Sequence, residues 1–234
     1  KPDERQNGAL GGEFNVSNNM AGPLDRQRLP LESLSGRFDW ADDGVRLTGL
    51  AARLPGQGRL NGSGNWQNGS LALDLEASAL DAVQLASVLR STRLNGSISA
   101  RIAADDQQLS VRLGDTRFVL DAEASHEHGR VRLSRLELAA GEARLTARGE
   151  LDTAQDMTFS VAGELERFDP SRFARGPAGM VNGTLSASGR LRPRPVVEAQ
   201  FVLRDSRLAG QPLTGRGDLV IDWPRIPRAD VQLA

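Results

Sequence analysis

The chain repeats a set of short segments in the same order, about 85 to 90 residues apart. Val-Arg-Leu at 45–47 returns at 131–133, and Asn-Gly-Ser at 95–97 returns as Asn-Gly-Thr at 182–184. A fixed period means that one supersecondary unit is stacked on copies of itself, so we expect one continuous elongated domain. Its expected parts are a partial repeat (1–40), repeat unit 1 (41–125), repeat unit 2 (126–212) and the start of a next repeat (213–234).

Apolar and polar residues alternate within these repeats. Leu71, Leu73 and Leu75, for example, occupy every second position, with small or acidic residues between them. Period-two alternation is typical of strands with one apolar and one polar face. Turn residues such as Asn68-Gly69 separate the runs, as in antiparallel hairpins. The pattern predicts strands near 34–40, 45–51, 58–66, 70–77, 93–102, 107–114, 117–125, 130–138, 143–151, 157–165, 183–190, 196–204 and 213–222.

Two short helices are expected to interrupt the strands at equivalent places. Asp81 is a suitable N-cap for a helix that carries the apolar residues between Val83 and Leu89. Asp169 can cap a turn that has Pro170 in its first position. Each helix would cover an edge or one end of the sheet.

A sheet with one apolar face has to bury that face. Helical sequence is too scarce to form a covering layer, which leaves a second sheet or a sheet that curls around a guest. We expect the second solution: an all-β fold in which an elongated, repeating antiparallel sheet curls into a hydrophobic groove (a repeating β-groove, or β-taco). The expected lining of the groove consists of apolar residues at alternate strand positions: Leu71, Leu73, Leu75, Leu109, Val111, Leu113, Val131, Leu133, Phe159, Val161, Leu185, Phe201, Leu203, Leu219 and Ile221.

The guest that fits such a groove is an acyl chain, because each buried methylene is worth about 0.8 kcal/mol and needs no directional contact. Small residues on the inner face are expected to permit curvature or to leave room for the guest: Gly62, Gly64, Ala147, Gly163 and Ala199. An unfolded amphipathic β-strand is an alternative guest. A purely structural β-repeat stalk with a dry, closed core is a third interpretation.

Composition argues against several other functions. The formal net charge is -1, which provides no electrostatic basis for nucleic-acid binding. Cysteine is absent, and His126 and His128 lie beside the expected turn at Gly129, so we expect a hairpin tip and no metal site. No arrangement of nucleophile and base resembles a catalytic motif, and we expect neither an enzyme nor a cofactor.

The segments that carry the repeats also carry a family resemblance. The segments concerned are 14–18, 22–25, 29–31, 34–36 and 198–203, followed by Leu208, Gly210, Pro212-Leu213 and Gly215. In this order they resemble the repeated segments of the TamB family, which belongs to the wider AsmA-like group. The resemblance covers most of the chain.

The resemblance implies a periplasmic protein of a Gram-negative bacterium, whose parent chain is held in the inner membrane by a segment absent from this sequence. It implies long β-sheets that fold into a hydrophobic groove. It implies phospholipid as cargo and an Omp85-type outer-membrane barrel protein as partner of the full-length parent. The expected function is therefore movement of phospholipid between the two membranes in support of outer-membrane protein assembly.

Overall fold

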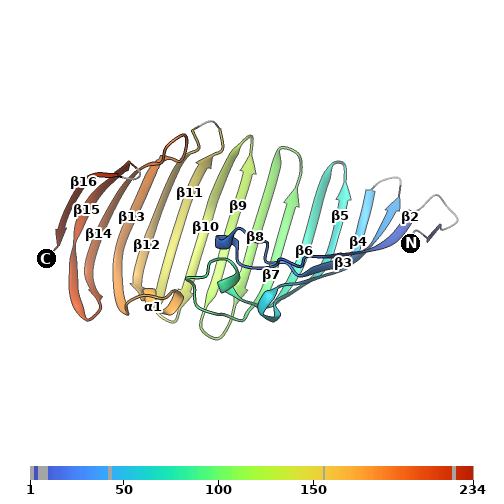
Figure 1. Ribbon diagram of the computed structural model, residues 1–234, viewed down its shortest axis with the longest axis horizontal. Helices are drawn as coiled ribbons and strands as arrows, with labels where there is room; N and C mark the ends of the chain where they lie inside the picture. Colours follow the sequence, from blue (N-terminus) through green and yellow to red (C-terminus); the bar gives the residue numbers. More distant parts are fainter. Residues whose placement is uncertain (1–2, 5–9, 42–43, 155, 223–224, 234) are drawn as a thin grey trace. The chain divides into compact units, whose positions relative to one another are not determined.

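Antiparallel strands make up most of the structure. The structure is a computed structural model, and it describes residues 3–4, 10–41, 44–154, 156–222 and 225–233. The chain divides into two units, 1–116 and 117–234. In each unit the strands lie side by side in chain order (Figure 1). Within each unit, every strand pairs only with its neighbours in the sequence, so each sheet is open and the expected curl is not seen.

The first unit contains β1 (Asp3–Glu4), β2 (Leu10–Ser17), β3 (Ser33–Ala41), β4 (Gly44–Arg53), β5 (Arg59–Gln67), β6 (Ser70–Leu80), β7 (Leu94–Ile102) and β8 (Asp106–Gly114). The second contains β9 (Val119–Glu127), β10 (Arg130–Ala140), β11 (Ala143–Asp152), β12 (Thr158–Phe168), β13 (Gly179–Arg190), β14 (Val196–Leu208), β15 (Gln211–Asp222) and β16 (Arg225–Leu233). The all-β prediction is confirmed, and every strand predicted from alternation is present. The repeat boundary expected between residues 125 and 126 falls inside β9.

Among the described residues, helical structure is limited to single turns. These are the 3-10 turns η1 (Leu24–Arg26), η2 (Pro55–Gln57) and η3 (Ala82–Gln84), and the four-residue α1 (Pro170–Phe173). The expected helix from Val83 to Leu89 does not form, and two short helices are therefore not confirmed. A single turn gains too few hydrogen bonds to propagate by itself. No helix in the described part of the chain is long and apolar enough to cross a bilayer.

Two-residue turns connect several of the hairpins. Asn68 and Gly69 have φ of 52° and 78°, and His128 and Gly129 have φ of 48° and 78°. Positive φ at both central residues is the type I′ geometry, whose twist matches that of paired strands. His128 accordingly lies at an exposed hairpin tip, as predicted. No group of three or more potential metal ligands occurs among the described residues.

β-Bulges interrupt the ladders at recurring positions. The register shifts between Leu47 and Leu50 in β4, and between Leu133 and Leu136 in β10. A second pair of shifts lies near the ends of β6 and β12, beside the Asn-Gly pairs that begin at Asn95 and Asn182. A bulge re-aims the strand that contains it and increases its local twist.

The Asn-Gly pairs stabilise these second bulges directly. The side-chain oxygen of Asn95 accepts a hydrogen bond from the backbone N–H of Ala79 at 3.0 Å, and that of Asn182 accepts one from Arg167 at 2.7 Å. Both donor residues have positive φ, 53° and 46°. A side chain on Gly96 would collide with the carbonyl oxygen of the strand opposite, so glycine is required there.

Buried apolar side chains gather at one end of the strands, next to the longer connections. In the first unit they are Leu50, Ala52, Ala77, Leu94 and Leu113, and in the second Phe118, Ala140, Ala143 and Val181. No large side chain among the described residues is fully buried. The core of each unit is therefore a narrow strip and not a layer between two sheets.

Candidate functional site: an open apolar face

The register places the predicted groove residues of the first unit on one face of its sheet. Residues that pair directly across an antiparallel ladder point to the same side. Leu71, Leu73 and Leu75 of β6 pair with Ile102, Ala100 and Ile98 of β7, which pair in turn with residues of β8. Six of the candidates thus share one face: Leu71, Leu73, Leu75, Leu109, Val111 and Leu113.

The other candidates share one face of the second unit in the same way. One row runs across the strands through Val131, Phe159 and Ile221, and the next through Leu133, Val161 and Leu219. Two further rows include Leu185 with Phe201, and Leu203. Apolar side chains therefore cover this face from β10 to β15 without a charged residue in these rows.

This apolar face is not covered by a second layer. Leu113 is the single buried member of the fifteen candidates. Leu109 is 44% exposed, Leu185 is 37% exposed, and the others are half-buried. Ordinary monomers seldom leave a contiguous apolar area of this extent in water.

Gly62 and Gly64, two of the small residues expected to permit curvature or to leave room for a guest, are covered by leucines. A Cβ on Gly64 would lie 2.7 Å from Cδ2 of Leu73, and one on Gly62 would lie 2.9 Å from Cδ2 of Leu75. The leucine of the neighbouring strand thus lies over the glycine. Gly217 is covered in the same manner by the Phe201 ring, whose atoms are 2.5 Å from the position of a Cβ. The glycines let large side chains lie flat, which makes the apolar face smoother.

Two hollows of the second unit lie on the opposite, polar face. The first, of about 630 Å³, is lined by side chains of two adjacent polar rows that include Thr146, Glu164 and Arg148. The second, of about 670 Å³, lies beside it, between rows that include Arg132 and Ser160. The polar rows flank a row of the predicted groove, so the lining also includes Leu185 and Phe201 in the first hollow and Leu133 and Val161 in the second.

Ion pairs lie on the polar face of each unit. Glu13 and Arg37 approach to 2.7 Å across β2 and β3, and Arg132 and Glu150 approach to 3.0 Å across β10 and β11. These groups are well exposed, so each pair contributes little to stability. They nevertheless specify the strand register, because a one-residue slip would separate the paired charges and exchange the polar and apolar faces.

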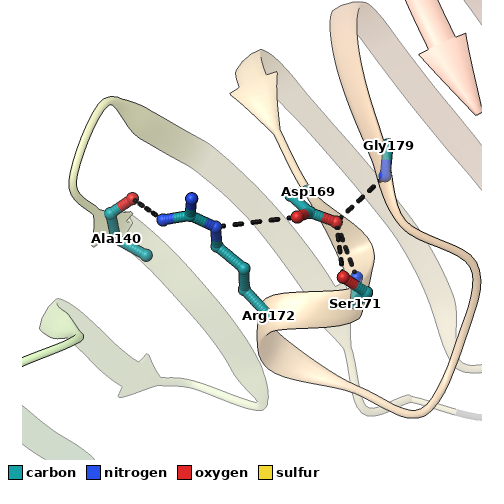
Figure 2. A network of polar contacts seen from close by, with 5 residues as sticks. All are labelled: Ala140, Asp169, Ser171, Arg172 and Gly179. Carbon is teal, nitrogen blue, oxygen red and sulfur yellow. Dashed lines mark hydrogen bonds and ion pairs between the residues drawn. The ribbon is translucent and has the colours of Figure 1, made fainter.

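Two aspartates tie the longer connections to the ends of the strands. Asp81 Oδ1 accepts hydrogen bonds from the backbone N–H groups of Val83 at 3.2 Å and Thr92 at 3.1 Å. Asp169 Oδ1 accepts from the N–H groups of Ser171 and Gly179, each at 3.1 Å (Figure 2). Each carboxylate thus caps a turn and also accepts a hydrogen bond from the backbone at or just before the start of the next strand, β7 or β13.

Asp169 is the centre of a wider network in the second unit (Figure 2). Burial tends to raise the pKa of Asp169, but hydrogen bonds from Ser171 and Gly179 and the charge of Arg172 outweigh it, and the pKa is lowered. Arg172 also donates to the carbonyl oxygen of Ala140 at 3.3 Å. The turn α1 is thereby fixed against the end of β10.

An aromatic cluster packs beneath this turn and was not predicted from the sequence. The ring of Phe173 lies 5.2 Å from that of Phe118 and 4.9 Å from that of Phe168. Phe118 is far in the sequence from Phe168 and Phe173, and the only local indication was the apolar character of each. The cluster packs the end of β12 and the turn α1 against the residue that precedes β9.

A polar latch in the first unit was also not predicted. The backbone N–H and the hydroxyl of Ser87 both donate to Asp25 Oδ2, at 2.8 and 2.7 Å. These hydrogen bonds lower the pKa of Asp25. They join the β2–β3 connection to the β6–β7 connection.

No known protein family, curated protein or solved structure matches the chain.

Proposed function

We propose that the apolar faces of the two units carry the acyl chains of phospholipids. The single observation that carries the proposal is the extent of uncovered Leu, Val and Phe side chains on one face of each sheet. An acyl chain laid on these side chains would gain about 0.8 kcal/mol for each methylene removed from water. Smooth apolar rows offer similar affinity at successive positions, which suits transfer better than storage.

In this proposal the sheet folds along its length around its guest and forms the hydrophobic groove. Open antiparallel sheets twist readily, and the β-bulges near Leu50 and Leu136 supply places where the strands can bend. The recurrence of these bulges, and of the Asp81 and Asp169 caps, supports a repeating arrangement. Membership of the TamB family, a periplasmic location and an Omp85-type partner belong to the same proposal.

The alternative of a structural stalk expects a dry, closed core. The half-exposed state of Leu73, Val161 and Phe201 favours a face that accepts a guest over a sealed one. A sealed core would hold its large side chains at full burial.

The test is extraction and native mass spectrometry of the purified chain. We expect co-purified phospholipid, recovered by solvent extraction and seen as mass-shifted ions of the folded protein. A photo-crosslinker in place of Leu73 or Val161 should then give lipid adducts, whereas one in place of Ser160 on the polar face should not. Peptide adducts in place of lipid would instead indicate binding of unfolded β-strands, and a chain free of both would refute the proposal.

A further inference from the structure

Three arginines surround a hollow in the first unit, on the polar side of the sheet. The hollow, of about 720 Å³, lies where β4 ends and β5 begins. Arg53, Arg59 and Arg93 line it, and Glu32 is the one carboxylate among its lining residues. The hollow therefore has an excess of positive charge.

The placement of two of these arginines is unfavourable in the absence of an anion. Arg53 and Arg59 pair directly across the β4–β5 ladder, and both are exposed. Like charges directly opposite each other destabilise a sheet. Opposite charges pair directly at other positions, as at Glu13 and Arg37, whereas Glu137 with Asp121 and Asp218 with Asp230 are like-charged acidic pairs.

Two carboxylates lie near the group: Glu32 lines the hollow, and Asp115 Oδ2 accepts a hydrogen bond from the backbone N–H of Arg93 at 3.4 Å. Among the residues that the structure describes, neither Arg53, Arg59 nor Arg93 forms an ion pair. Glu32 is exposed, and it likewise has no ion pair in this described part. The guanidinium donors are thus available to a ligand.

We propose that this hollow binds a phosphate group. Guanidinium groups match the oxygens of phosphate with paired, charge-assisted hydrogen bonds. Ser78 and Gln57 supply a hydroxyl and an amide to the same lining. The hollow is much larger than one phosphate, so it accepts a phosphate ester as well as the free ion.

The turn that forms one wall of the hollow is held by its own backbone. The N–H of Leu54 donates to the carbonyl oxygen of Gly58 at 2.8 Å, and Gln57 has φ of 74°. Gly58 is buried, and a Cβ there would lie 3.2 Å from Cβ of Leu54. The spacing between Arg53 and Arg59 is therefore set before a ligand arrives, which lowers the entropic cost of binding.

The inference does not depend on lipid transport, because a phosphate could come from a lipid headgroup or from a soluble compound. The first probe is inorganic phosphate, titrated at constant ionic strength while backbone amide shifts are followed by NMR. We expect saturable shifts at residues 53–59, 78–79 and 93. The double variant Arg53→Gln/Arg59→Gln should bind phosphate at least about tenfold more weakly, since it removes two charge-assisted contacts.

Arg101→Gln is the matched control. Arg101 is exposed on the same polar face, pairs with Ala72, and does not line the hollow. We expect its phosphate affinity to stay within about twofold of the unmodified chain. Equal weakening by Arg101→Gln, undiminished affinity in the double variant, or shifts spread over all arginines would overturn the site.

A second probe, dihexanoyl phosphatidylglycerol below its micelle concentration, identifies the source of the phosphate. Tighter binding than inorganic phosphate, with additional shifts on the apolar face, assigns the site to a lipid headgroup. Equal affinity without those shifts assigns it to soluble phosphate. If the chain binds phosphate but retains no lipid, the lipid-transport proposal is refuted and the phosphate site stands. If the chain does not bind phosphate, and the double variant retains as much lipid as the unmodified chain, the phosphate site is refuted and the lipid-transport proposal stands.

Discussion

A single charge on the apolar face distinguishes an open surface from a sealed core. Val161 is half-buried in the middle of β12, where it pairs with Gly149 on one side and Ala187 on the other. Because both partners are small, a carboxylate in Val161→Asp can reach water without displacing a large side chain. The substitution therefore tests whether the apolar face is open to water, without disrupting the packing of the sheet.

The expected effects follow from the partial burial of this side chain. Fully burying valine is worth about 1.5 to 3 kcal/mol, of which about half is realised here. The poor strand propensity of aspartate adds up to about 1 kcal/mol. We expect the free energy of unfolding to fall by about 2 kcal/mol, whereas a charge in a sealed core would cost more than about 4 kcal/mol.

The loss of lipid should be much larger than the loss of stability. An acyl chain that crosses this position would lie against a carboxylate, and a charge in an apolar phase costs about 2.5 to 3.5 kcal/mol. Bound phospholipid should therefore fall at least about tenfold. Urea unfolding measures the stability, and solvent extraction measures the lipid.

Ala162→Asp is the control one residue away. Ala162 lies on the polar face and pairs with Arg148 across β11 and β12, so the new carboxylate meets an opposite charge. We expect a stability change within about 1 kcal/mol and unchanged lipid. If Val161→Asp unfolds the chain, or if both variants retain equal lipid, the argument from an open apolar face is refuted.

Three further predictions concern the fold. Gly217→Ala should lower the free energy of unfolding by about 1 to 3 kcal/mol, because the added Cβ meets the Phe201 ring. Urea unfolding measures this change, and a variant as stable as wild type would contradict the packing of Phe201 over Gly217. The lowered pKa of Asp169 means that its carboxylate stabilises the fold above the unfolded pKa, near 4, and that this contribution is lost as the pH falls through the lower folded value. Asp169→Asn should therefore be less stable than wild type at pH 7, and the difference should shrink as the pH falls through that lower folded value; parallel pH profiles would exclude this role. Ser87→Ala removes one of the two hydrogen bonds to Asp25 and should speed tryptic cleavage of the β2–β3 connection, while unchanged cleavage would show that the latch does not restrain it.

Local patterns were sufficient to predict strands and faces. Leu71, Leu73 and Leu75 alternate with polar or small residues, and alternation directly specifies which side chains share a side of an extended chain. Asn68-Gly69 specifies a tight turn because both residues tolerate positive φ. These two short-range effects account for the success of the strand predictions.

The common face of the candidate residues in each unit could be predicted from the sequence, but not how those side chains pack. Which residue faces which depends on register, and the bulges shift register at places that alternation alone does not mark. The cover of Gly64 by Leu73 follows from that register, so room for a guest at this glycine could not be judged from the sequence. The helix expected after Asp81 failed because capping can start a turn but cannot supply the packing that extends it.

Extended backbone, hairpins and the division into an apolar and a polar face follow from neighbours a few positions apart, so the chain's order of residues is enough to infer them. Contacts between distant segments are different, because they depend on where whole strands are brought by the ladder. The Phe118–Phe168–Phe173 cluster, the Asp25–Ser87 latch and the arginines around the 720 Å³ hollow belong to this second group. Each requires residues of separate strands or connections to meet, and no local pattern encodes that meeting.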